Sequence, residues 1–215
     1  MKELYIIGAG GFGREVAWLV ERINETEKIW DLKGFIDDNK DIWGIMEDDY
    51  PVIGGCDFFE TIQHDVWVVC AVGSAKVRKK IIEKIEQYTH VHFGTVIDPT
   101  AQISKRVTIG EGTIICAGNI ITVDIAIGRH NIINLDCTIG HDAILHDYVT
   151  VYPSVNISGN SEVGECSELG TGMQIIQGKK VGNNSILGAG AVVIKDIPDN
   201  CVAVGSPATV KKTIA

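Results

Sequence analysis

The sequence predicts a small α/β unit over residues 1–93, followed by an all-β parallel β-helix over residues 94–215. Two observations predict this division. In the first part, short apolar strands alternate with amphipathic helical stretches, which is typical of parallel βαβ pairing. In the second part, an aliphatic residue recurs at every sixth position, a period that neither a helix nor an ordinary strand produces.

The α/β unit is expected to begin with an apolar strand over residues 4–7 that runs into a glycine-rich turn. Apolar residues with helical spacing follow over residues 14–23. Further strands are expected over residues 34–36 and 66–72, and a basic amphipathic helix over residues 76–86. This order of elements predicts a Rossmann-like subdomain.

The second part is a series of hexapeptides with one aliphatic residue each. Ile, Leu or Val stands at all 17 positions taken every sixth residue from Ile97 to Val193. Three hexapeptides, 18 residues, form one turn of a triangular coil in which each aliphatic residue stacks on its equivalent in the next coil. Seven of the residues that directly follow these positions are glycine, and we expect them to allow the backbone conformation needed near a corner.

Charge and composition exclude several classes of protein. The 28 acidic residues outnumber the 19 Lys and Arg residues, and this net charge of −9 argues against a nucleic-acid or anionic-membrane partner. The longest apolar run, residues 66–72, is too short for a membrane span, and the N-terminus lacks a signal-peptide pattern. The six cysteines form no CxxC and fit buried reduced thiols, so we expect a cytoplasmic protein.

The glycine-rich turn between the first strand and the first helix reads Gly8-x-Gly10-x-x-Gly13. This spacing fits a dinucleotide-binding fingerprint, and Asp37 and Asp38 follow at roughly the distance expected for ribose contacts. The unit is too small for the full six-stranded domain that holds both halves of NAD. This small size argues against NAD as the ligand of the turn.

Several motifs carry a resemblance to a known family. Ile139-Gly140-His141-Asp142, the stretch Leu-Gly-Ala-Gly-Ala-Val-Val at residues 187–193 and the tail Val-Gly-Ser-Pro-Ala at residues 204–208 resemble left-handed β-helix acyltransferases. With the glycine-rich opening at residues 7–15, the chain resembles bacterial sugar acetyltransferases related to sialic-acid O-acetyltransferases and nucleotide-amino-sugar N-acetyltransferases. The resemblance implies a left-handed coil, a homotrimer with active sites between neighbouring prisms, and acetyl-CoA as the donor.

Acetyl transfer to an amine or hydroxyl needs a base beside the acceptor, and histidine, with a pKa near ~6.5, suits this task at neutral pH. His141 stands where the family carries its base, and Asp142 matches the adjacent acid. A carboxylate bonded to one ring nitrogen fixes the tautomer and stabilises the imidazolium that forms. By the same resemblance, Asn134 binds the acceptor.

The resemblance also assigns residues around the two ligands. Near the nucleotide-sugar we expect Gly10, Gly11, Asp37, Asp38 and Gly73, with Arg78 on its phosphates. Phe12 stands where some relatives have a histidine that contacts the acceptor, and Thr150 stands where relatives can carry a second histidine that meets the thioester. The pantetheine groove is expected along Gly159, Thr171 and Ala189. Residues 171–215 carry five lysines and a net charge of +3, which suits the phosphates of CoA.

Four functions stay open on the sequence. N-acetylation of an amino group on a nucleotide-linked amino-deoxy sugar comes first, because the N-terminal unit fits a nucleotide. O-acetylation of sialic acid or another sugar hydroxyl is the second candidate, and a non-catalytic β-helix that binds a nucleotide-sugar is the third. The fourth rests on His141-x₄-His146, which resembles the paired zinc ligands of γ-class carbonic anhydrases. A catalytic zinc needs three protein ligands, and His130 is the only histidine between residues 93 and 140, so we expect no metal.

Overall fold

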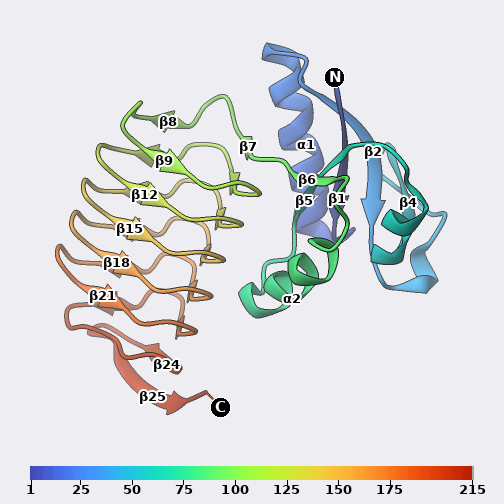
Figure 1. The fold of residues 1–215 in the computed structure, drawn as a ribbon. Coiled ribbons are helices and arrows are strands. Elements are labelled where there is room, and N and C mark those ends of the chain that lie inside the picture. The colour runs from blue at the N-terminus through green and yellow to red at the C-terminus, as the bar shows by residue number, and fades with distance from the viewer. Residues whose placement is uncertain (215) are drawn as a thin grey trace.

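The computed structural model describes residues 1–214 and has an α/β domain beside a three-sided parallel β-helix (Figure 1). The α/β domain holds a six-stranded sheet in the order β3-β4-β2-β1-β5-β6, parallel except where β3 meets β4. Its elements are β1 (Lys2–Ile7), α1 (Gly11–Thr26), β2 (Trp30–Ile36), the 3₁₀ helix η1 (Lys40–Ile42), β3 (Met46–Glu47), β4 (Tyr50–Gly54), the 3₁₀ helix η2 (Cys56–Thr61), β5 (Val66–Cys70), α2 (Ala75–Ile85) and β6 (Val91–Phe93).

Each predicted hexapeptide forms one two-residue strand that ends at the predicted aliphatic residue. These strands build three parallel sheets, and residues 18 apart pair, as Ile121, Ile139 and Ile157 do. The first sheet contains β7 (Val96–Ile97), β10 (Ile114–Ile115), β13 (Ile132–Ile133), β16 (Thr150–Val151), β19 (Glu168–Leu169) and β22 (Ile186–Leu187), followed by β24 (Cys201–Val204) and β25 (Thr209–Thr213). The second contains β8 (Gln102–Ile103), β11 (Ile120–Ile121), β14 (Thr138–Ile139), β17 (Asn156–Ile157), β20 (Gln174–Ile175) and β23 (Val192–Val193). The third contains β9 (Thr108–Ile109), β12 (Ala126–Ile127), β15 (Ile144–Leu145), β18 (Glu162–Val163) and β21 (Lys180–Val181).

Three edges, made of the turns between strands, join these sheets. The first edge lies between the first and second sheets and includes Leu135, Pro153, Thr171 and Ala189. The second edge lies between the second and third sheets and includes His141, Gly159 and Lys195. The third edge lies between the third and first sheets and includes His130, Tyr148 and Cys166.

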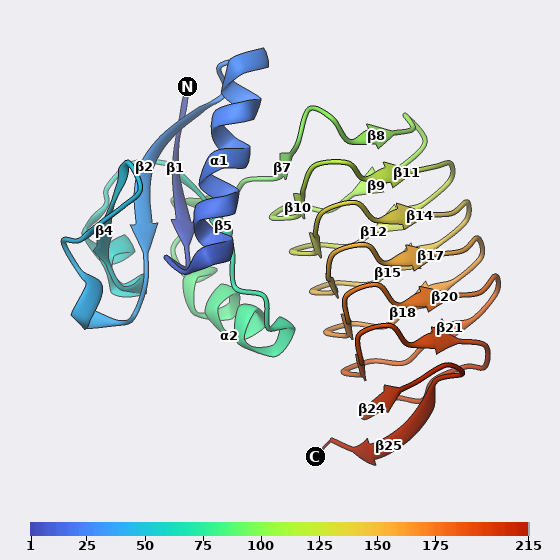
Figure 2. The ribbon, with the colours of Figure 1, turned by 180° about the vertical axis from the view of Figure 1, so that it is seen from behind.

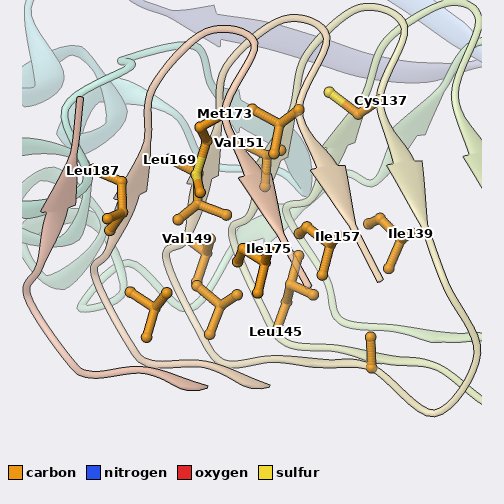
Figure 3. Packing of buried hydrophobic residues seen from close by; sticks show 14 of the residues in the cluster. Cys137, Ile139, Leu145, Val149, Val151, Ile157, Leu169, Met173, Ile175 and Leu187 are labelled. Atoms are coloured by element: carbon orange, nitrogen blue, oxygen red, sulfur yellow. The ribbon is translucent and has the colours of Figure 1, made fainter. Parts of the chain in front are cut away.

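The aliphatic residues fill the interior of the coil. Ile139, Ile157 and Ile175 stack one above another in the second sheet, each 2% exposed or less (Figure 3). Small or slender side chains such as Cys137 and Val149 complete the interior beside them. Each fully buried aliphatic side chain contributes about 1.5–3 kcal/mol, so the repeat that is visible in the sequence is also the main source of stability.

We expected the glycines that follow the aliphatic residues to adopt the backbone conformation of the corners, but they do not have positive φ angles. Positive φ angles occur instead three residues after the aliphatic positions from Ile109 to Leu187, at every sixth residue from Gly112 to Gly190, including Asp142 at 60°. Gly140 has ordinary backbone angles, but a Cβ atom there would lie 2.6 Å from the backbone nitrogen of Gly159 in the next coil. These glycines are therefore required by the close approach of successive coils.

The α/β domain packs against the first sheet of the β-helix (Figure 2). The apolar face of α1, with Val16 and Val20, shares one buried cluster with the outward-facing Ile114 and Ile132. The domain thereby covers the first sheet from β7 to β16 and the third edge around His130 and Tyr148, and it leaves the second edge uncovered. The two parts form one packed unit along this interface.

All six cysteines are buried and free of disulfide bonds within residues 1–214. Burial raises the pKa of the Cys137 thiol to about 11, so it stays protonated at neutral pH. No helix in the described part of the chain has the length and apolar character to cross a membrane.

Candidate active site

His141 lies on the second edge, directly after β14. Its Nδ1 atom lies 2.8 Å from Oδ2 of Asp142, and both side chains are half-exposed. The repeat places them together, because the turn conformation at Asp142 brings its carboxylate back beside the preceding ring. With Nδ1 bonded to the carboxylate, Nε2 carries the free lone pair and is the atom available to accept a proton.

Gly159 lies one coil further along the same edge, under the imidazole ring. A Cβ atom at Gly159 would lie 2.5 Å from Nε2 and 2.6 Å from Cε1 of His141. A glycine at this position is therefore what allows the ring to lie flat on the next coil. The sequence assigned Gly159 to the pantetheine groove, and the structure adds contact with the ring of the histidine.

The glycine-rich turn between β1 and α1 separates into two pairs of glycines. Gly8 has a φ angle of 100°, and a side chain on Gly13 would collide with the carbonyl oxygen of Gly8, so the fold itself requires these two. Cβ atoms at Gly10 and Gly11 would meet nothing within 4 Å. The second pair therefore leaves open space at the start of α1, where the first N–H groups of the helix have no side-chain cap.

A pocket of about 450 Å³ lies at the ends of β2 and β4. Its walls include Asp38, Trp43, Phe58 and Lys84. The carboxylate of Asp38 accepts a hydrogen bond from the backbone N–H of Cys56. Asp37, the preceding residue, accepts from the N–H of Ala9 and thus holds the glycine-rich turn. The edge of the sheet where parallel strands end is the usual ligand position in such α/β domains.

A second pocket, of about 200 Å³, lies between the α/β domain and the first edge of the β-helix. It brings together four of the predicted residues, Phe12, Gly73, Asn134 and Thr150. Asn134 accepts a hydrogen bond from the N–H of Leu135 through Oδ1, and its Nδ2 has no partner within residues 1–214. Nδ2 is therefore a free donor at the wall of this pocket.

The structure corrects two of the predicted contacts. Arg78, expected on the phosphates, is 1% exposed, and its guanidinium donates to backbone carbonyls of both domains. Burial also lowers its pKa. Thr150, expected on the thioester, is 1% exposed, and its hydroxyl donates to the carbonyl of Gly73 and accepts from Arg78. Neither group has a donor left for a ligand, because the interface between the domains uses them all.

Within one chain, the predicted catalytic and acceptor residues do not meet. His141 and Gly159 lie on the second edge, whereas Asn134 lies beside the first edge, which continues through the exposed Thr171 and Ala189. The whole second sheet lies between the two edges. The outward-facing residues of that sheet are mostly polar, such as Gln102, Thr138 and Asn156, and include the apolar Ile120, which is 42% exposed.

The lysines of the C-terminal part differ in their availability. Lys180 forms an ion pair with Glu162 at 2.5 Å and lies on the third sheet. Lys195 is exposed and lies on the second edge, three coils beyond His141. Lys195 is therefore the lysine best placed for an anionic group that extends along the same edge as the histidine.

Sequence reasoning missed several residues that line the two pockets. Glu15 and Tyr152 line the smaller pocket, and Trp43 lines the larger one. Glu15 stands four residues after Gly11 on α1, so helical spacing from the glycine-rich turn could have indicated it. Nothing in the local pattern around Trp43 or Tyr152 indicates a pocket.

The geometry around the second histidine bears on the zinc alternative. His146 lies on the third sheet, and its Nε2 is 2.9 Å from Oε1 of Glu162, a different carboxylate from the partner of His141. Among residues 1–214, no three His, Cys, Asp or Glu side chains are grouped as ligands for a metal ion.

Comparison with known proteins decides the family. Residues 3–85 match the model of the PglD N-terminal domain family. The acetyltransferase domain of PglB from Neisseria gonorrhoeae, solved with acetyl coenzyme A, is 30% identical, with a TM-score of 0.87 over 98% of this chain and 99% of that one. This chain belongs to the hexapeptide-repeat, left-handed β-helix acetyltransferases. It is an acetyl-CoA-dependent acetyltransferase, as the resemblance implied.

Two further relatives of this acetyltransferase differ in their acceptors. Perosamine N-acetyltransferase from Caulobacter crescentus, solved as a histidine-to-asparagine variant with CoA and GDP-perosamine, is 29% identical, with a TM-score of 0.88 over 99% of this chain and 98% of that one. Galactoside O-acetyltransferase from Lactococcus lactis is 35% identical over 130 residues, which are 58% of this chain. The matched stretch spans 54% of that enzyme, about half its length.

Proposed function

We propose that this acetyltransferase transfers the acetyl group of acetyl-CoA to an amino group of a nucleotide-linked amino-deoxy sugar, with His141 as the general base. The observation that carries the proposal is the pairing of His141 Nδ1 with Asp142 at 2.8 Å above Gly159. This arrangement leaves one ring nitrogen free and supplies a carboxylate to stabilise the imidazolium.

The proton follows one route through this pair. Nε2 of His141 accepts the proton that the amine loses as its nitrogen attacks the thioester carbonyl. The new C–N bond forms and the C–S bond breaks, and Nε2 then returns the proton to the departing CoA sulfur. Asp142 keeps its negative charge throughout and stabilises the ring while it is charged.

We also propose that the enzyme acts as a homotrimer. The base and the acceptor pocket lie on different edges of one chain, and the outer face of the sheet between them is exposed, with Ile120 as an apolar side chain at its surface. A second copy that packs on this sheet would bring its second edge, with His141, to the first edge of its neighbour. The donor would lie along that junction, where Gly159, Lys195, Thr171 and Ala189 are expected to contact it.

An amine suits the smaller pocket better than a hydroxyl does. Glu15 lines the pocket, and its carboxylate attracts an ammonium group, whereas the free Nδ2 donor of Asn134 can bond a sugar oxygen in either kind of acceptor. The glycine-rich turn, and the larger pocket at the ends of β2 and β4, fit a nucleotide. O-acetylation remains the second candidate, because the galactoside O-acetyltransferase matches over 58% of this chain.

The experiment is a panel of UDP-, dTDP-, GDP- and CMP-linked amino sugars, each with acetyl-CoA, with release of the CoA thiol as the readout. Matched nucleotide-linked hydroxy sugars, sialic acid and galactosides serve as O-acceptors. We expect turnover with an amino sugar and a product that survives mild alkali, because an amide resists base that cleaves an ester.

Two results would replace N-acetylation of a nucleotide-sugar by another function. An alkali-labile product made only from hydroxy sugars would replace N-acetylation by O-acetylation. Release of no thiol with any acceptor, together with stoichiometric zinc that His146→Ala removes, would favour the zinc enzyme.

A further inference from the structure

Arg78 joins the two domains more extensively than any sequence pattern indicates. Its Nε donates to the carbonyl of His130 at 2.9 Å, and its Nη2 donates to the carbonyl of Tyr148 at 2.8 Å, both on the third edge of the β-helix. Its Nη1 donates to the carbonyls of Val72 and Gly73, at 2.7 and 3.1 Å, in the loop between β5 and α2. One buried cation thus holds the backbone of both domains together, and every one of its donors has a partner.

Thr150 continues this connection towards the smaller pocket. Its Oγ1 accepts from Nη2 of Arg78 at 2.9 Å and donates to the carbonyl of Gly73 at 2.7 Å. One coil further, Oε1 of Glu168 accepts from the backbone N–H of Ala75 at 2.9 Å. The segment of residues 72–75 is therefore fixed on the first sheet by two side chains that stand 18 residues apart.

The same segment forms part of the pocket wall. Gly73 and Thr150 both line the smaller pocket, together with Asn134. The loop also follows β5, so it lies at the edge of the α/β sheet where the nucleotide is expected. Any shift of this loop relative to the coil changes the distance between the nucleotide site and the wall of the acceptor pocket.

We propose that Arg78 and Thr150 are positioning residues, which act through the carbonyl of Gly73 to hold the nucleotide-bound acceptor at a fixed place over the β-helix. The inference rests on the proposed function, since it assumes an acceptor carried by the α/β domain. It assigns both residues to acceptor alignment rather than to phosphate or thioester contact.

The test is Thr150→Val, which keeps the shape of the side chain and removes the hydroxyl. Loss of the two hydrogen bonds that this hydroxyl makes, with Arg78 and with the carbonyl of Gly73, predicts a rise of about fivefold to tenfold in the KM for the nucleotide-sugar that gives turnover. The KM for acetyl-CoA stays unchanged. Thr150→Ser, which restores a hydroxyl, returns the acceptor KM to within about twofold of the wild-type value.

Thr113→Val is the matched control. Thr113 is a buried coil threonine whose hydroxyl donates to the carbonyl of Gly128 at 3.1 Å, a contact made entirely within the β-helix. Its loss destabilises the coil without touching the loop of residues 72–75. A rise in acceptor KM in both variants, no rise in Thr150→Val, or a rise only in the KM for acetyl-CoA would overturn the proposal.

A second readout separates this proposal from the proposed function. Hydrogen exchange of the amides in residues 72–78 is expected to be faster in Thr150→Val than in wild type and unchanged in Thr113→Val. If the wild-type enzyme acetylates no nucleotide-sugar, the proposed function fails, and exchange still reports whether Thr150 holds the loop. Unchanged exchange in Thr150→Val would contradict the positioning role whatever the activity.

Discussion

The second and third edges of the β-helix carry two histidines with opposite surroundings. His141, on the second edge, is half-exposed and has a carboxylate partner 2.8 Å away. His130, on the third edge, is 1% exposed, and neither ring nitrogen has a partner in the described structure. Its ring stacks on Tyr148 and meets the edge of Phe93. Both histidines belong to the same repeat, so the repeat alone does not decide what a histidine does.

What differs between the two edges is the cover that the α/β domain provides. Phe93 and α2 close over the third edge, and burial there lowers the pKa of His130 to about 4, with the charges of Arg129 and Arg78 adding to the effect and that of Asp147 opposing it. The second edge stays open. A histidine that is exposed and paired suits proton transfer, whereas one that is buried and neutral serves packing.

The largest expected effect is on catalysis at the open edge. His141→Ala removes the base and is expected to lower kcat by about 10²–10⁴, while the melting temperature stays close to that of wild type because the ring is half-exposed. Steady-state kinetics and a thermal melt measure the two quantities. His146→Ala is the control, because His146 is similarly exposed and carboxylate-paired but lies on the third sheet. An equal loss in both variants would remove His141 from its role.

The next largest expected effect is a pH dependence of the free energy of unfolding, caused by His130 on the third edge. His130 has a lowered pKa of about 4 in the folded protein and an ordinary value near ~6.5 when unfolded, so the unfolded chain binds more protons between these values. Its contribution to the free energy of unfolding is complete above pH ~6.5 and falls by about 3 kcal/mol as the pH drops to ~4.

Denaturant unfolding of wild type and His130→Asn across this range measures that contribution. Asparagine tolerates the positive φ angle of 54° at this position. The difference between the two proteins cancels the titration of other groups and is expected to shrink as the pH falls. A difference that does not change with pH would show that His130 does not titrate in this way.

A smaller effect is expected from Gly159, which lies under the ring of His141 on the second edge. Gly159→Ala places a methyl group against the ring of His141, and the ring has room to move outward because it is half-exposed. We expect kcat to fall about tenfold, since misplacement of a catalytic group by an ångström is costly, with little change in the melting temperature. Ser158→Ala, one residue earlier and exposed, is the control. Normal kcat in Gly159→Ala would separate this glycine from the ring position.

The smallest effect is expected where the covered edge meets solvent. Lys79 pairs with Glu165 at 2.6 Å across the domain interface, but both side chains are more than a third exposed. Lys79→Met is therefore expected to change the free energy of unfolding by less than about 1 kcal/mol. Denaturant unfolding checks this value. A loss of several kcal/mol would mean that the interface depends on this surface pair as well as on its buried contacts.

The sequence predicted most of the β-helix, because each hexapeptide contains its own structural information. Every aliphatic position became the end of a strand, and the pairing of His141 with Asp142 follows from their neighbouring places in one turn. The roles of Arg78 and Thr150 were not predictable, because they depend on how two domains meet and on residues more than 70 positions apart. The prediction that glycines after the aliphatic residues form the left-handed turns was wrong. Those glycines are needed for contacts between coils, and they stand out in the sequence more than the Asp and Asn residues that do occupy turns.

The most direct test of the account mixes two inactive proteins, His141→Ala and Gly10→Trp. The tryptophan fills the open space at the glycine-rich turn, and the φ angle of −73° at Gly10 accepts any side chain. If each site combines the acceptor pocket of one copy with His141 of another, a refolded equal mixture regains about a quarter of wild-type activity, because one site in four is intact. Activity no greater than that of the separate variants, in a mixture whose wild-type control refolds fully, would contradict the account.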